Sequence, residues 1–157
     1  MASVTSGCPV RSSSAATTRA IAERAVNVVE EVFEMMKKMN DIFSTINPNI
    51  FYDLRKYHPQ TWELFHKFKT EFILEQVEKS LEKGKRDGFV RADVNSKLLA
   101  KLRGEEIEMG FNSTIFPPDK FRILDVQIAF VEHFLYGICT LKGHKLINKH
   151  KQIVEEE

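Results

Sequence analysis

The residues with the most capacity for ligand chemistry are aromatic and methionine side chains in the first half of the chain. They lie on three segments expected to be successive helices, whose short connections bring them together. An apolar cavity lined by aromatic rings and flexible methionines accepts varied hydrophobic ligands, whereas a tightly interdigitated aliphatic core leaves no room. The competing interpretation, preferred for any single residue, is core packing. The set comprises Met36, Met39, Phe43, Phe51, Tyr52, Trp62, Phe65, Phe68 and Phe72. It predicts a pocket for a small apolar or amphipathic molecule.

A second candidate group combines charge with expected burial. By spacings of three and four, the helix face that carries Glu106 also holds Leu98, Leu102 and Met109, so its carboxylate is expected to point inward. A buried carboxylate needs a partner, which Arg103 or His133 can supply. Two interpretations stay open: a structural ion pair, which is preferred, and a group that orients a ligand in the pocket.

The sequence carries no pattern typical of catalysis or of a metal site. The five histidines, at 58, 66, 133, 144 and 150, form no HxxxH or HExxH pair on one helix face. We find no nucleophile elbow, glycine-rich phosphate loop or paired-acid constellation, and Cys139 lies in an apolar segment without a nearby base. The sequence therefore predicts no enzyme activity, no metal and no cofactor.

Length and composition narrow the class of protein further. The chain has 157 residues, 43% hydrophobic and 29% charged, which suits one ordinary globular domain. A formal net charge of +1 calls for neither nucleic acid nor an anionic membrane as a partner. Only Cys8 and Cys139 occur, and no run reaches the roughly 18 apolar residues of a membrane-spanning helix. We expect a soluble, cytoplasmic protein.

The periodicity of apolar residues predicts an all-α fold. Helices are expected from about Thr17 to Ile46, over a short segment capped by Asn49, from Pro59 to Leu81, from an Asp93 cap to about Phe111, and from Pro118 to about Leu141. No segment shows sustained strict alternation, which argues against strands. Long helices with short connections predict an antiparallel bundle.

The last expected helix carries more apolar surface than one core can cover. Apolar residues occupy two adjoining faces along nearly its whole length, and a large exposed apolar stripe is uncommon on a monomer. Pairing of the last two long helices across a two-fold axis would bury the stripe in a four-helix arrangement. Periodicity does not say which face turns inward. The stripe expected at the homodimer interface comprises Leu124, Ile128, Val131, Leu135 and Ile138.

The stretch from about Val26 to Gln152 resembles the C-terminal domain of TetR/AcrR-type bacterial transcriptional regulators. The resemblance is carried by NPNIFYDLRKYHP, GKRDGFVRADVNSKLLAKL and FVEHFLYGICTLKGHKL, in this order. It implies an antiparallel helical bundle that dimerises through its last two long helices. It also implies the sensing of a small effector, coupled to transcription regulation.

The resemblance also implies a helix-turn-helix domain of about fifty residues ahead of this region. Residues 1–19 lack its pattern and are expected to be a disordered leader or remnant, followed by the helical domain at 20–152 and an acidic tail at 153–157. DNA binding is then expected only through a domain absent from this chain. A truncated regulator and a sensor-only protein both stay open. The alternative function is a helical interaction module that forms heterodimers with a full-length regulator.

Overall fold

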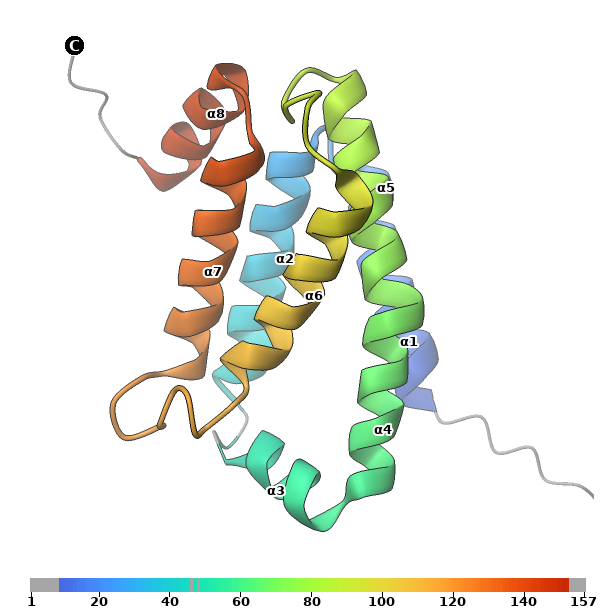
Figure 1. The fold of residues 1–157 in the computed structure, drawn as a ribbon, viewed down its shortest axis with the longest axis vertical. Helices are drawn as coiled ribbons and strands as arrows, with labels where there is room; N and C mark the ends of the chain where they lie inside the picture. Colours follow the sequence, from blue (N-terminus) through green and yellow to red (C-terminus); the bar gives the residue numbers. More distant parts are fainter. Residues whose placement is uncertain (1–8, 46, 48, 153–157) are drawn as a thin grey trace, which may run out of the picture.

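The computed structural model describes residues 9–45, 47 and 49–152, except the side chains of residues 9–15, Met39 and Phe43. The described part is all helical, as the periodicity predicts, and contains no β-strand (Figure 1). Its elements are α1 (Pro9–Arg24), α2 (Val28–Phe43), α3 (Ile50–Tyr57), α4 (Pro59–Phe68), a π-helical turn η1 (Lys69–Ile73), α5 (Leu74–Arg86), α6 (Ser96–Gly110), α7 (Ile123–Ile138) and α8 (Leu141–Lys151).

The first expected helix is two helices, because Asn27 starts a new one. Its side chain accepts a hydrogen bond from the Glu30 backbone N–H at 2.9 Å, while the Glu30 carboxylate accepts one from the Val26 N–H at 2.8 Å. These bonds satisfy backbone donors at the start of α2, as an N-cap does. Helix α1 begins at Pro9 and so crosses the boundary expected at residue 20. Residues 1–8 and 153–157 of the expected leader and tail lie outside the described part.

The middle of the chain follows the predicted pattern more closely. The short helix before Pro59 is present as α3, although Asn49 makes no side-chain capping bond. Pro59 opens α4, where its missing N–H costs nothing. Helices α4 and α5 form one long rod down the side of the bundle, interrupted by η1 and ending at Arg86 (Figure 1).

Helix α6 starts two residues later than predicted. Asn95, and not Asp93, is its N-cap, and the Asn95 side chain accepts from the Leu98 N–H at 3.0 Å. The Asp93 carboxylate instead pairs with Arg91 at 3.1 Å.

The last expected helix, Pro118 to about Leu141, is present as α7, which begins only at Ile123, and the helix that follows it, α8, was not predicted. Helix α7 ends at Ile138, Cys139 is extended and forms an isolated bridge with Val90, and the Thr140 hydroxyl accepts from the Gly143 N–H to cap α8. The bridge and the cap turn the chain, so α8 folds back on the end of the bundle (Figure 1).

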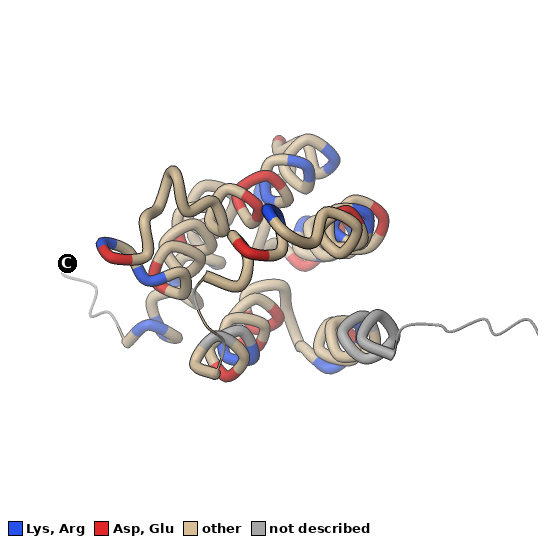
Figure 2. Tube along the Cα trace, turned by 90° about the horizontal axis from the view of Figure 1, so that it is seen from below, with Lys and Arg blue, Asp and Glu red and all other residues tan. Residues whose placement is uncertain are grey.

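The hydrophobic core lies at the end of the bundle where α2 begins and α5 and α7 end. Val29, Leu81, Leu135 and Ile147 are at most 2% exposed there. Helices α3 and α4, at the opposite end, bury no residue completely. Acidic and basic residues are spread around the bundle without a face of one sign (Figure 2). We call the two ends the core end and the open end.

Candidate functional site

The open end holds a pocket of about 480 Å³ between α3, the start of α4, the end of α6 and the loop that follows α6. This volume falls within the range of small-molecule sites. Three of the predicted pocket residues, Phe51, Tyr52 and Trp62, line it. The remaining lining residues are Arg55, Lys56, Glu108, Phe111, Asn112, Ser113, Thr114 and Ile115.

Aromatic rings form the wall of the pocket and join α3 to α6. The rings of Phe51 and Phe111 stack with centroids 3.9 Å apart and planes 21° apart. Phe65 lies behind them, 6.5 Å from Phe51 and 6.1 Å from Phe111, and Trp62 is 5.4 Å from Phe65. Such pairs gain energy beyond the area they bury. The wall therefore keeps an apolar, planar surface in a region without a buried core.

Two cations of α3 stand at the same pocket. The Arg55 guanidinium lies 6.0 Å from the Trp62 ring centroid, and the Lys56 ammonium lies 5.4 Å from Tyr52 and 5.0 Å from Tyr57. Hydrogen bonding with the hydroxyls of Tyr57 and then Tyr52 raises the pKa of Lys56 above its ordinary value. Lys56 therefore carries full positive charge at neutral pH.

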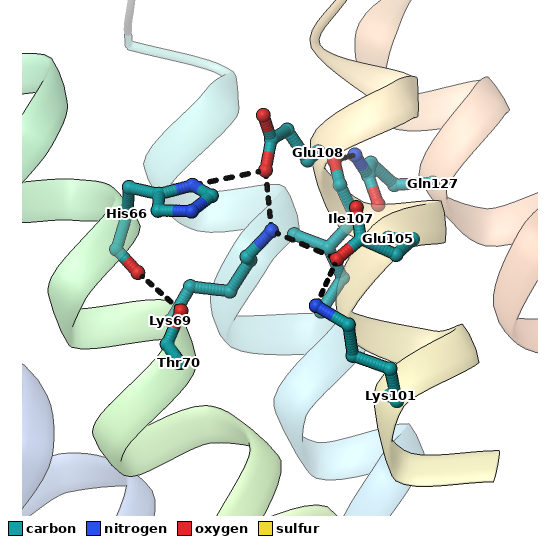
Figure 3. A network of polar contacts seen from close by, with 8 residues as sticks. All are labelled: His66, Lys69, Thr70, Lys101, Glu105, Ile107, Glu108 and Gln127. Atoms are coloured by element: carbon teal, nitrogen blue, oxygen red, sulfur yellow. Dashed lines mark hydrogen bonds and ion pairs between the residues drawn. The ribbon is translucent and has the colours of Figure 1, made fainter. Parts of the chain in front are cut away.

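On the core side of the pocket, the fully buried Lys69 joins the rod formed by α4, η1 and α5 to helix α6 (Figure 3). The Lys69 ammonium pairs with the Glu108 carboxylate and with Glu105 at 3.5 Å. His66 Nδ1 lies 3.3 Å from Glu108, and the Lys101 ammonium donates to Glu105 at 2.7 Å. The Lys101 bond holds the pKa of Glu105 below its usual range. Because Glu108 also lines the pocket, this network connects the pocket to the interior.

Lys69 lies on the same side of the rod as three aromatic residues. Trp62, Phe65, Lys69 and Phe72 recur at spacings of three and four, which places them on one side of a helix. The π-helical turn begins at Lys69, and such turns often occur at functional sites. A buried ammonium needs paired acceptors, which the two glutamates of α6 provide.

The end of α6 that carries Glu108 and Phe111 is fixed by α7. Gln127 of α7 is 1% exposed, and its amide nitrogen donates to the Ile107 carbonyl oxygen at 2.9 Å (Figure 3). A Cβ at Gly110 would lie 2.3 Å from that nitrogen, so only glycine allows this approach. The pocket wall is thus held by a buried polar contact at its base.

The other predicted pocket residues lie outside the lining. Met36 packs against the core, and Phe68 stacks on Phe72 at 5.2 Å further along the rod. Phe65 supports the wall from behind. The side chains of Met39 and Phe43 lie outside the described residues. This pocket lies where α3 meets α4 and α6.

The charged candidates on α6 and α7 form an ion pair and an exposed residue. Arg103 Nη1 lies 3.3 Å from Glu106 Oε2, and both residues are at least 91% buried. Burial lowers the pKa of Arg103, and Glu106 partly offsets this effect. The expected inward direction of Glu106 is confirmed, but Leu98 and Leu102 on its predicted face are exposed. His133 is exposed and forms no pair with Glu106.

The stripe expected at the dimer interface lies largely inside the chain's own core, which corrects the choice of face. Val131, Leu135 and Ile138 are 5%, 1% and 3% exposed, and they pack against α2 and α5. Leu124 and Ile128 are half-buried. The reason is that α2, α6 and α8 cover this face of α7, so an interface must use other residues.

Sequence reasoning missed the ring of Phe111, the loop at 112–115 and the charged part of the site: Arg55, Lys56, Lys69 and Glu108. Lys69 had a usable signal, because it interrupts an aromatic stripe at the position where a ring is expected. Glu108 and the loop had none, since their role depends on how α6 docks against α3 and α4.

Two chemistries lack support in the described part of the chain. No three His, Cys, Asp or Glu side chains there are grouped so that they could hold a metal ion. Cys139 is a free thiol, and burial raises its pKa to about 11, which keeps it protonated and unreactive at neutral pH. Nor does any described helix combine the length and hydropathy needed to cross a membrane.

Comparisons with known proteins give no relative for this chain. Neither a protein-family model, nor a curated protein, nor a solved structure matches it.

Proposed function

We propose that the chain is the ligand-sensing and dimerisation domain of a TetR-like transcriptional regulator, which binds a small amphipathic effector at the open end. The resemblance of the sequence motivates this assignment, and the all-helical bundle agrees with it. The observation that carries the proposal is the pocket, because three aromatic residues predicted to line it converge there with charged groups. Pockets with apolar walls and a few placed polar groups are typical ligand sites.

A ligand in this pocket acts on the rest of the domain through Glu108. This carboxylate lines the pocket and also holds the buried Lys69. A ligand that shifts Glu108 therefore changes the pairing of Lys69, at the π-helical turn, with α6. Sensing then consists of a shift between two positions of α6 relative to the rod, which requires that the ligand bind one of them more tightly.

The proposed output is a change in the homodimer. The outer face of α6 exposes Leu98, Leu102 and Met109, at 64%, 48% and 37%, a row of apolar side chains that a partner would cover. Because α6 also carries the pocket residues Glu108 and Phe111, one helix connects ligand to interface. In this proposal the second copy packs on α6 and the outer side of α7.

A thermal-shift screen of apolar and amphipathic compounds tests ligand binding, since a ligand that binds only the folded state raises the melting temperature. Trp62→Ala should abolish the shifts of true pocket ligands. Phe72→Ala is the matched control, because Phe72 lies on the same rod outside the pocket. Hits that survive Trp62→Ala, or the absence of any hit, would contradict the proposed pocket.

Light scattering after size exclusion tests the dimer. Leu98→Glu combined with Leu102→Glu should give monomers, since unpaired charges in an apolar contact are costly. Leu141→Glu is the control, because Leu141 is also an exposed leucine, at 80%, but lies on α8. A wild-type monomer at tens of micromolar would remove the homodimer. Association of that monomer only with a full-length regulator of this type would favour the heterodimer module instead.

A further inference from the structure

We infer that the ligand of the open-end pocket is a planar aromatic anion, such as an aromatic carboxylate, whose ring contacts the aromatic wall and whose charge is held by Arg55 and Lys56. This inference rests on the proposed function and specifies its ligand class. Three properties of the pocket lead to it: the charges that are available, the surfaces that are already occupied, and the shape of the wall.

The charge balance of the pocket favours a negative ligand. Its lining includes two cations, Arg55 and Lys56, and one acid, Glu108. The acid is already paired with Lys69 and lies near His66. Among the ion pairs of the described residues, none includes Arg55 or Lys56. An incoming ligand therefore meets two positive charges outside any ion pair, of which Lys56 also interacts at longer range with Asp53, and one negative charge that is already paired.

The aromatic rings do not form a site for a cation. A ring that recognises an ammonium group needs a free face, and the rings of Trp62 and Tyr52 each already have a side-chain cation within about 6 Å of the centroid. A cationic ligand would also be repelled by Arg55 and Lys56. The same two residues suit a carboxylate, because a guanidinium binds one through two parallel hydrogen bonds and an ammonium adds a point charge.

The shape of the wall favours a planar ligand. The rings of Phe51 and Phe111 are stacked within 21° of each other, and Trp62 adds an indole to the lining. Asn112, Ser113 and Thr114 of the loop add polar groups to the same lining. A flat ring contacts the wall while its acid group faces Arg55, and a volume of about 480 Å³ accommodates a bicyclic acid.

Isothermal titration calorimetry on the full chain tests the charge requirement with three compounds of equal shape: 2-naphthoate, 2-naphthamide and 2-naphthylmethylammonium. We expect the acid to bind on the order of tenfold more tightly than the amide, as a charge-assisted contact provides, and the ammonium to bind weakest. Arg55→Gln with Lys56→Gln should remove the preference for the acid. Lys97→Gln with Lys145→Gln, which removes the same charge from exposed positions outside the pocket, should keep it.

The outcomes separate this inference from the proposed function. Equal affinity for the acid and the amide, or tightest binding of the ammonium, overturns the aromatic-anion inference but leaves ligand sensing in place. A preference for the acid that survives the double substitution overturns the roles of Arg55 and Lys56. If none of the three compounds binds, the inference fails. The proposed function fails with it only if the broader screen also gives no hit that depends on Trp62.

Discussion

The two ends of the bundle are built from different interactions. At the core end, aliphatic side chains from α2, α5, α7 and α8 pack without exposure, and the backbone bridge between Val90 and Cys139 fastens α8 to the turn after α5. At the open end, α3 and α4 bury no residue completely and are held by aromatic pairs and by the contact of His66 with Glu108 of α6. The core end supplies the stability of the fold, and the open end leaves room for a ligand.

This division shows why a binding site can move without unfolding the domain. Regions with few buried apolar contacts open at low free-energy cost, while the core remains folded. Lys69 lies between the two ends and is fully buried. We therefore expect the loss of folding stability caused by a substitution to decrease from the core end toward the open end. Substitutions in the Lys69 network should have an intermediate effect.

The largest effect should come from truncating a core leucine. Leu135→Ala removes a side chain that is 1% exposed and should destabilise the fold by about 4 kcal/mol, through lost burial and the cavity that remains. Leu64→Ala makes the same chemical change at the open end, where the side chain is 46% exposed, and should cost less than about 1 kcal/mol. Urea unfolding of both variants measures the difference. Equal losses would abolish the contrast between the ends.

The next largest effect should follow from removing the acceptors of Lys69. Glu105→Gln with Glu108→Gln leaves a buried ammonium without a carboxylate and should cost about 3 kcal/mol. Lys69→Met is the matched control, because it keeps the apolar stem and leaves two glutamates that reach solvent. It should cost clearly less in the same unfolding measurement. The opposite order would mean that the charge of Lys69 is not buried in solution.

The sequence predicts the elements whose boundaries are set locally. The start of α4 follows from Pro59, whose ring suits a first helical turn, and the all-α class follows from the three-four spacing of apolar residues. The break at Asn27 escapes periodicity, because the apolar rhythm continues across it, and α8 was not predicted at all. In both cases a side-chain cap starts a helix where a polar residue falls at the right position.

The site is predictable only in part. Phe51, Tyr52 and Trp62 were expected at a pocket because they lie on neighbouring helices joined by a short turn. Which face of α7 turns inward stays open in the sequence, since its two apolar faces are equivalent in periodicity and only the placement of α2 and α8 distinguishes them. The polar residues of the pocket are not predictable from periodicity either, because their positions depend on how α6 packs against α3 and α4.

The buried thiol offers a chemical test of the core end. Burial raises the pKa of Cys139 from 9.0 to about 11, so the folded state holds its proton more tightly than the unfolded state. The resulting stability is present below pH 9 and is lost as the pH rises through 11. In a Cys8→Ser background, a thiol reagent at pH 8 should label Cys139 only after denaturant is added. Rapid labelling of the folded protein would show that the core end opens.

Replacing Cys139 by alanine provides the control for the pH dependence. The Cys139→Ala variant lacks the titrating thiol, so the loss of stability that it provides between pH 9 and 11 should be absent. A loss of the same size in both proteins would assign the alkaline effect to other groups.

The smallest effect should appear at the turn that joins α5 to the bridge. Gly88 has a φ of 78°, and its N–H donates to the Lys85 carbonyl while the Phe89 N–H donates to the Gly84 carbonyl. This is the pattern of a helix that ends through a left-handed residue.

Nothing lies within 4 Å of a Cβ added at Gly88 or at Gly137, so neither alanine meets a clash. The two sites differ in backbone conformation alone. Gly88→Ala should therefore destabilise by about 1 kcal/mol, because alanine resists a positive φ, whereas Gly137→Ala should stabilise α7 by about 0.5–1 kcal/mol. Urea midpoints that shift in the same direction for both variants would mean that the turn does not require the left-handed conformation at Gly88. The bridge at the core end would then be held by its hydrogen bonds alone.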